Sequence, residues 1–87
     1  MAPYNPPTAS HYTELDVSEY TEDFMWFVIG YKGKNFYDIT NWLQLDYLWY
    51  NNVKNVVEIW GPWKSLNDGR AKEKISNLLR LYKEIHV

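Results

Sequence analysis

The sequence predicts one small α+β domain whose elements follow the order β-α-α-β-β-α. Its 87 residues are enough for a single domain only. Apolar residues alternate in some segments and recur every three or four residues in others, and turn-forming residues separate these segments. Five Trp, eight Tyr and three Phe supply the bulky side chains that a small core needs.

The N-terminal part begins with an expected flexible tail. Residues 1–10 hold three of the four prolines and show no periodicity, so we expect the domain itself to span residues 11–87. Alternation over residues 12–17 predicts a strand in which Leu15 and Val17 share one face.

Two short helices are expected next, joined by a loop. Ser18 or Thr21 can cap the first helix, and Gly30 marks its end. The second helix is expected over residues 34–43. Its inward stripe has a spacing of three and four residues: Phe36, Ile39 and Leu43.

A hairpin and a last helix complete the expected order. Residues 47–50 and 56–60 are β-prone and lie on either side of Asn51-Asn52, which favours a turn. The last helix is expected to contain Gly69 near its start. Its apolar stripe consists of Ala71, Ile75, Leu78, Leu79, Tyr82 and Ile85.

The loop between the first two expected helices has the residues best suited to binding a phosphate. Gly30 and Gly33 have no Cβ and can take positive φ, so main-chain amides can approach a phosphate where a helix begins. Lys32 and Lys34 add positive charge. Residues 1–30 contain five acids and no Lys or Arg, whereas the remainder holds nine basic residues against six acids. This split permits a locally basic surface on a chain of net charge −2.

This order and these residues resemble a type I KH domain over residues 12–82. Residues 28–33 read Val-Ile-Gly-Tyr-Lys-Gly, similar to the Val-Ile-Gly-x-x-Gly of the family, and Phe36 and Ile39 follow at the expected intervals. Residues 57–61 match the pattern of the third strand of the family, which ends in Gly.

The resemblance implies a three-stranded antiparallel sheet with three helices packed on one face. It also implies binding of single-stranded RNA or DNA, with the loop holding about four nucleotides. Catalysis and a cofactor are not expected, because the four Ser and two His residues form no recognisable set of nucleophile and base. The expected RNA-binding residues are Trp26, Ile29, Gly30, Tyr31, Lys32, Gly33, Lys34 and Phe36. Trp26 departs from the family pattern, because many members have Gly there. Its ring either closes the groove or offers a surface on which a base stacks. The simplest interpretation of Trp26, Phe36 and Trp42 is packing in the core, because a small domain needs bulky side chains there.

A second interpretation is a KH-like module for protein contact, including homodimerisation, through the open face of the sheet. If Val57 and Ile59 face the helices, Glu58 and Trp60 face away from them. Some of the Tyr and Trp rings of the hairpin would join them in an exposed aromatic patch, which commonly marks an interface. With no Cys and two His, no zinc-type ligand set is expected, and an intracellular setting is the simplest expectation. No apolar run is long enough to predict a membrane span.

Overall fold

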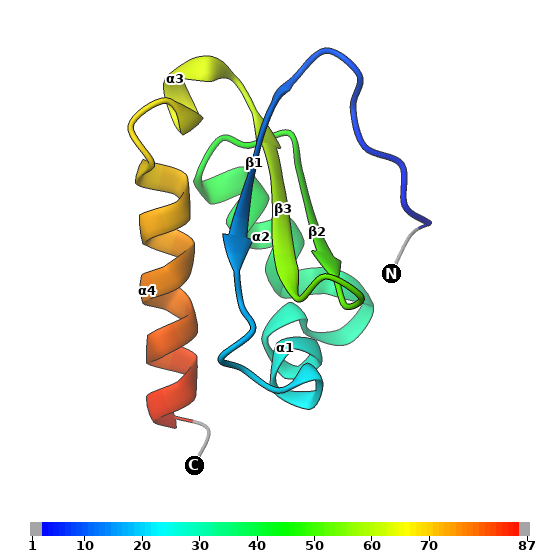
Figure 1. Cartoon of the computed structure of the whole chain (residues 1–87), viewed down its shortest axis with the longest axis vertical. Helices are drawn as coiled ribbons and strands as arrows, with labels where there is room; N and C mark the ends of the chain where they lie inside the picture. Colours follow the sequence, from blue (N-terminus) through cyan, green and yellow to red (C-terminus); the bar gives the residue numbers. More distant parts are fainter. Residues whose placement is uncertain (1–2, 86–87) are drawn as a thin grey trace.

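A computed structural model of the chain describes residues 3–85, so residues 1–2 of the expected tail and residues 86–87 of the expected domain lie outside the described part. The described chain is an α+β domain with a three-stranded antiparallel sheet (Figure 1). Its elements are β1 (His11–Asp16), α1 (Glu22–Ile29), the 3-10 turn η1 (Tyr31–Gly33), α2 (Lys34–Trp42), β2 (Tyr47–Asn51), β3 (Val56–Gly61), α3 (Trp63–Leu66) and α4 (Arg70–Ile85).

The strands lie in the order β1-β3-β2, so β3 is central and pairs antiparallel with both neighbours. The expected hairpin of β2 and β3 is confirmed. On the face away from the helices, two rows of side chains cross the sheet. They are Tyr12, Trp60 and Tyr47 in one row, and Glu14, Glu58 and Trp49 in the other.

The core lies between the other face of the sheet and the helices. Val57 and Ile59 of β3 are fully buried, together with Met25 of α1 and Ile75 of α4. Burying one such side chain stabilises the fold by about 1.5–3 kcal/mol. The predicted alternation of β3 is therefore confirmed, because its apolar residues supply the centre of the core.

The first helix begins and ends where the sequence predicts. The backbone N–H of Phe24 donates to Oγ1 of Thr21 at 3.1 Å, which makes Thr21 the N-cap of α1. At the other end, Gly30 takes φ 82° and its N–H donates to the carbonyl of Trp26 at 3.1 Å. This geometry stops α1 and sends the chain into the loop.

The C-terminal helical region differs from the expectation in one respect. Gly69 was expected inside the helix, but it has φ 74° and precedes α4, so a separate short helix, α3, lies before it. The carbonyl of Gly69 accepts the N–H of Glu73 at 3.0 Å, and the carboxylate of Asp68 accepts the N–H of Arg70 at 2.9 Å. Positive φ is incompatible with a helix interior, and this explains the break.

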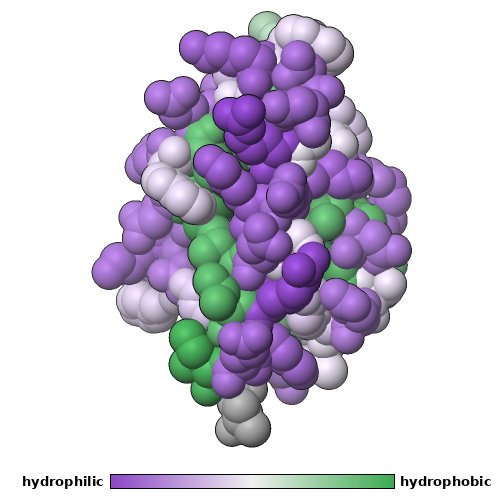
Figure 2. All heavy atoms as spheres, turned by 90° about the vertical axis from the view of Figure 1, so that its left-hand side faces the viewer, coloured by the Kyte–Doolittle hydropathy of each residue, from purple (hydrophilic) through white to green (hydrophobic). Residues whose placement is uncertain are grey.

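The apolar stripe of α4 is confirmed except at its end. Ala71, Ile75 and Leu79 are buried, whereas Ile85 is exposed because it extends past the sheet. Figure 2 shows the α4 side of the molecule, where a narrow hydrophobic band crosses a mainly hydrophilic surface. Leu81 and Ile85 are the exposed large apolar residues of this helix.

Candidate nucleic-acid interface

The loop between α1 and α2 is held in a conformation that depends on positive φ angles. Gly30 has φ 82° and ψ 172°, Gly33 has φ 77° and ψ 16°, and Lys32 between them has φ 55°. The first of these combinations is open essentially to glycine alone, and the other two are left-handed. The two glycines therefore serve a local need of the backbone, whatever the loop binds.

Asn35 fixes the loop against the end of α1. Its Nδ2 donates to the carbonyl of Val28 at 3.0 Å. A Cβ atom placed on Gly30 would lie 2.8 Å from that Nδ2, closer than side chains tolerate. A side chain at Gly30 would therefore force the Asn35 side chain to move, in addition to the backbone strain at this φ.

The amides of the loop fall into two groups. Gly33 N–H donates to the carbonyl of Gly30 at 3.0 Å, and Lys34 N–H donates to the carbonyl of Tyr31. The amides of Tyr31 and Lys32 lie between these bonds in an exposed stretch, and Tyr31 is 83 % exposed. These two N–H groups are the donors that an anion in solvent can approach.

Positive charge lies beside these amides. Lys32 and Lys34 are both exposed, and neither takes part in the ion pairs found within residues 3–85. The Nζ of Lys32 lies 5.4 Å from the centroid of the Tyr31 ring, a cation–π distance. The loop thus offers two cations whose charge is not neutralised by a described carboxylate.

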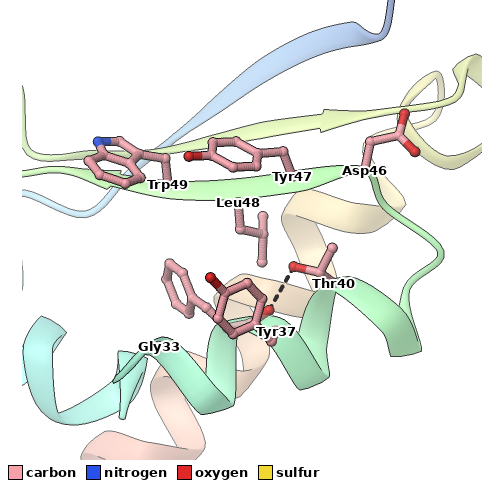
Figure 3. A pocket seen from close by; sticks show the side chains of 8 residues that line it. Gly33, Tyr37, Thr40, Asp46, Tyr47, Leu48 and Trp49 are labelled. Atoms are coloured by element: carbon pink, nitrogen blue, oxygen red, sulfur yellow. Dashed lines mark hydrogen bonds between the residues drawn. The ribbon is translucent and has the colours of Figure 1, made fainter. Parts of the chain in front are cut away.

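A pocket of about 60 Å³ lies between α2 and β2 and begins at the loop (Figure 3). Gly33 is part of the loop and also lines the pocket. The other residues that line the pocket are Phe36, Tyr37, Thr40, Asp46, Tyr47, Leu48 and Trp49. In Figure 3, Leu48 points towards α2, whereas Tyr47 and Trp49 lie on the opposite side of β2. The pocket is therefore mainly apolar, with a carboxylate at Asp46.

The eight residues expected to bind RNA are divided between surface and core. Trp26, Tyr31, Lys32 and Lys34 are exposed, and Gly30 is half-buried. Gly33 and Phe36 are buried but line the pocket. Ile29 is only 1 % exposed and does not line the pocket, so it supports the fold from within the core rather than forming the groove floor.

Trp26 was expected to lie in the core if it had a purely structural role. It is instead 44 % exposed, and its ring meets that of Tyr50 edge to face at a centroid distance of 5.3 Å. Trp42, another expected core residue, is 60 % exposed. The indole of Trp26 thus connects α1 to β2 at Tyr50, and Trp26 does not line the pocket between α2 and β2.

The sequence did not single out Tyr37, Thr40 or Leu48 as pocket residues. Tyr37 lies outside the inward stripe of α2, and nothing in its spacing distinguishes it from a solvated residue. These residues meet because α2 packs beside β2, which is a tertiary contact. Adjacency of this kind has no signal in a single sequence.

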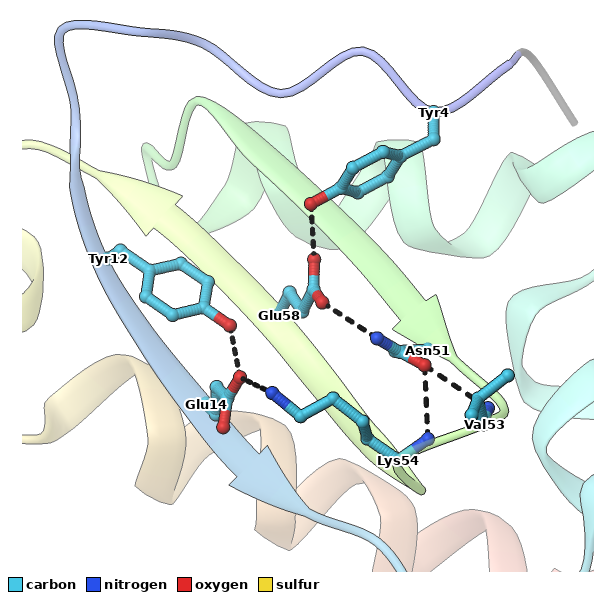
Figure 4. A network of polar contacts seen from close by, with 7 residues as sticks. All are labelled: Tyr4, Tyr12, Glu14, Asn51, Val53, Lys54 and Glu58. Atoms are coloured by element: carbon cyan, nitrogen blue, oxygen red, sulfur yellow. Dashed lines mark hydrogen bonds and ion pairs between the residues drawn. The ribbon is translucent and has the colours of Figure 1, made fainter.

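On the open face of the sheet, the N-terminal segment approaches the strands through Tyr4 (Figure 4). The ring of Tyr4 lies 4.8 Å from that of Trp49 and 6.1 Å from that of Trp60, and its hydroxyl donates to Glu58 at 2.8 Å. Glu58 and Trp60 face away from the helices as expected, but they are only 6 % and 8 % exposed. The expected exposed aromatic patch is therefore covered in large part by the protein's own tyrosines.

A second polar group lies on the same face. Glu14 accepts hydrogen bonds from the Tyr12 hydroxyl and from Lys54, and these bonds hold its pKa below the ordinary value. Partial burial and the same carboxylate raise the pKa of Tyr12. The Nζ of Lys54 lies 3.0 Å from Oε2 of Glu14, so the charge of Lys54 is paired within this group.

Tyr4 is expected to make folding sensitive to pH above about 10. Partial burial and the hydrogen bond to Glu58 raise the pKa of Tyr4 from 10.0 to about 12. Because the folded chain holds this proton more tightly, the stabilisation is complete below about pH 10 and is lost as the pH rises to about 12. Chemical denaturation across this range should show a larger loss for the wild type than for Tyr4→Phe. Equal losses would contradict the role of this hydroxyl.

Within residues 3–85, no group of three or more His, Cys, Asp or Glu side chains is arranged to hold a metal ion. None of the helices in this part of the chain is long and apolar enough to cross a bilayer. Comparisons with models of known families, with curated proteins and with solved structures found no match. Function must therefore be inferred from the geometry of the chain itself.

Proposed function

We propose that this protein is a KH-like module that binds single-stranded RNA, or single-stranded DNA, through the loop at residues 30–33 and the pocket beside it. One observation carries this proposal: a loop with exposed residues and two lysines outside the described ion pairs lies directly beside an aromatic pocket, and Gly33 belongs to both the loop and the pocket. A single strand needs these two kinds of contact, one for its phosphates and one for its bases.

The backbone of the strand would lie at the loop. The amides of Tyr31 and Lys32 would donate to phosphate oxygens, and the ammonium groups of Lys32 and Lys34 would neutralise their charge. The strand would then run along α2 towards β2. Asp46 lies at the pocket and would repel phosphate, which favours a path with the phosphates at the loop end.

The bases would lie between α2 and β2. Tyr37 is 53 % exposed and lines the pocket, so its ring is available to a flat ligand, whereas the Trp49 ring lies on the opposite side of β2. Stacking on an aromatic side chain is worth about 1–3 kcal/mol per base. The pocket is small, which suits one base rather than a long groove, and weak binding by a single copy is expected.

The resemblance to type I KH domains is consistent with this proposal. The order strand, helix, loop, helix, strand, strand, helix and the antiparallel sheet are compatible with that family. The short helix α3 is an addition to the three helices of the expected pattern.

Titration of ¹⁵N-labelled protein with a short mixed-sequence RNA tests this function. Amide shifts are expected at residues 30–34 and at Phe36, Tyr37 and Leu48, and the affinity should fall as salt increases, since phosphate contacts release counterions. A parallel titration with DNA of the same sequence shows whether the 2′-hydroxyl matters. Shifts confined to the strand residues of the open face, or no shifts at all, would refute the proposed function.

Protein contact through the open face of the sheet is the second candidate. Tyr12 is 46 % exposed on that face, and its ring centroid lies 4.8 Å from that of Trp60. Part of the Tyr12 ring is therefore available at the surface for a protein partner. Self-association without any response to RNA would favour this function. Sedimentation of the protein alone measures it directly.

A further inference from the structure

A different pocket, of about 300 Å³, lies where α1, the end of β2 and the N-terminal segment meet. Its lining residues are largely aromatic and include Tyr4, Trp26 and, at the edge formed by β2, Trp49 and Tyr50. The Trp26 and Tyr50 rings meet edge to face at 5.3 Å, and those of Tyr4 and Trp49 do so at 4.8 Å. Glu58 adds a carboxylate to this lining.

The carboxylate of Glu58 is buried without a cationic partner among the described residues. One oxygen accepts the Tyr4 hydroxyl at 2.8 Å, and the other accepts Nδ2 of Asn51 at 3.0 Å (Figure 4). Both donors are neutral, and the ion pairs of residues 3–85 do not include Glu58. A buried carboxylate is normally paired with a positive charge, because removing it from water is costly. Its two oxygens also retain acceptor capacity.

No described cation offsets the charge of Glu58. Glu14 lies directly opposite Glu58 on β1, and the Lys54 ammonium is paired with Glu14 rather than with Glu58. Asn52 lines the pocket and donates to Glu22 at 2.8 Å, which places a further carboxylate at its edge. The pocket therefore combines the Glu58 carboxylate with electron-rich aromatic residues, has Glu22 near its edge, and has no cation among its lining residues.

We propose that this pocket binds an alkylated ammonium group, carried either by a methylated lysine side chain or by a free quaternary ammonium compound. Aromatic faces attract such cations through their quadrupoles, and Glu58 supplies the opposite charge. Alkylation favours this site because a primary ammonium is strongly hydrated, and aromatic walls offer few acceptors to replace its water. The site is separate from the loop of residues 30–33 and does not depend on the proposed RNA function.

Two probes of nearly equal shape test the charge requirement. Choline carries a trimethylammonium group, whereas 3,3-dimethylbutan-1-ol has the same shape without charge. Choline is expected to shift the indole N–H signals of Trp26 and Trp49 at concentrations at which the alcohol does not. Equal shifts by both compounds, or no shift with choline, would overturn the proposal.

The source of the ammonium group can be distinguished with a short peptide that contains trimethyllysine. Tighter binding of this peptide than of choline identifies a lysine side chain as the ligand. Equal or weaker binding identifies the free compound. Both results support recognition of an alkylated ammonium group.

The carboxylate is tested by Glu58→Gln, which preserves shape and can still accept a hydrogen bond from Tyr4. Choline affinity is expected to fall at least about tenfold, whereas Trp63→Leu, which removes an exposed indole on α3, should leave it unchanged. Unchanged affinity in Glu58→Gln would refute the site. If that variant does not fold, Trp49→Leu takes its place with the same expectation and the same criterion.

Discussion

Replacing Tyr31 and Lys32 together by Asp is expected to weaken binding of single-stranded RNA by at least about tenfold, equivalent to about 1.4 kcal/mol, without unfolding the protein. Both side chains are exposed in the loop, so the core loses no contact. The change removes one cation and places two carboxylates where phosphates are proposed to lie. The slope of affinity against salt should also become less steep, because fewer counterions are released.

The chain offers a matched control for this change. Trp63 and Lys64 on α3 are likewise an adjacent exposed aromatic and lysine, and replacing both by Asp alters the net charge by the same amount. If the loop is the binding site, the control retains wild-type affinity in fluorescence anisotropy with labelled RNA. Equal weakening in both variants would mean that net charge alone governs binding. Unchanged affinity in the loop variant would remove the loop from the site.

Gly30→Ala is expected to reduce the free energy of unfolding by about 2–3 kcal/mol. The backbone of Gly30, at φ 82° and ψ 172°, is strained for any residue with a Cβ, which costs about 1–3 kcal/mol. The new atom would also meet Nδ2 of Asn35 at 2.8 Å and threaten its bond to Val28. A domain of this length has about 4–13 kcal/mol in total, so the loss is large and measurable by denaturation in urea.

Gly69→Ala separates the two causes of this loss. Gly69 also has positive φ, at 74°, but a Cβ there would meet nothing within 4 Å. Its replacement should therefore cost only about 1–2 kcal/mol, from backbone strain alone. If Gly30→Ala lowers the free energy of unfolding no more than Gly69→Ala does, the close approach to Asn35 contributes nothing measurable to the loss.

Much of the fold was predictable because its signals are local. The Thr21 cap, the end of α1 at Gly30 and the alternation of β3 each depend on residues close together in the chain, and all three are confirmed. Gly69 was assigned wrongly, since a glycine inside a helix and one that breaks it differ only in φ. The four-residue helix α3 was missed for a similar reason, because one turn is too short to show periodicity.

The candidate site was less predictable. The exposure of the loop and of its two lysines could be inferred from composition, but the place of the aromatic residues could not. Trp26 was expected in the core as the simplest interpretation, yet it lies half-exposed against Tyr50, because β2 ends beside α1. Tyr4 belonged to the expected tail and nevertheless contacts Glu58, which is 54 positions away in the sequence.

The sequence by itself determined the order of the elements, the alternation of the central strand and the glycines of the loop, because backbone preference and hydrophobic periodicity act over a few residues. Only the tertiary structure decided which rings face a pocket, that Glu58 is buried without a cation, and that Gly33 joins the loop to the space between α2 and β2. These features arise from contacts between segments far apart in the chain, and such contacts depend on packing rather than on local preference.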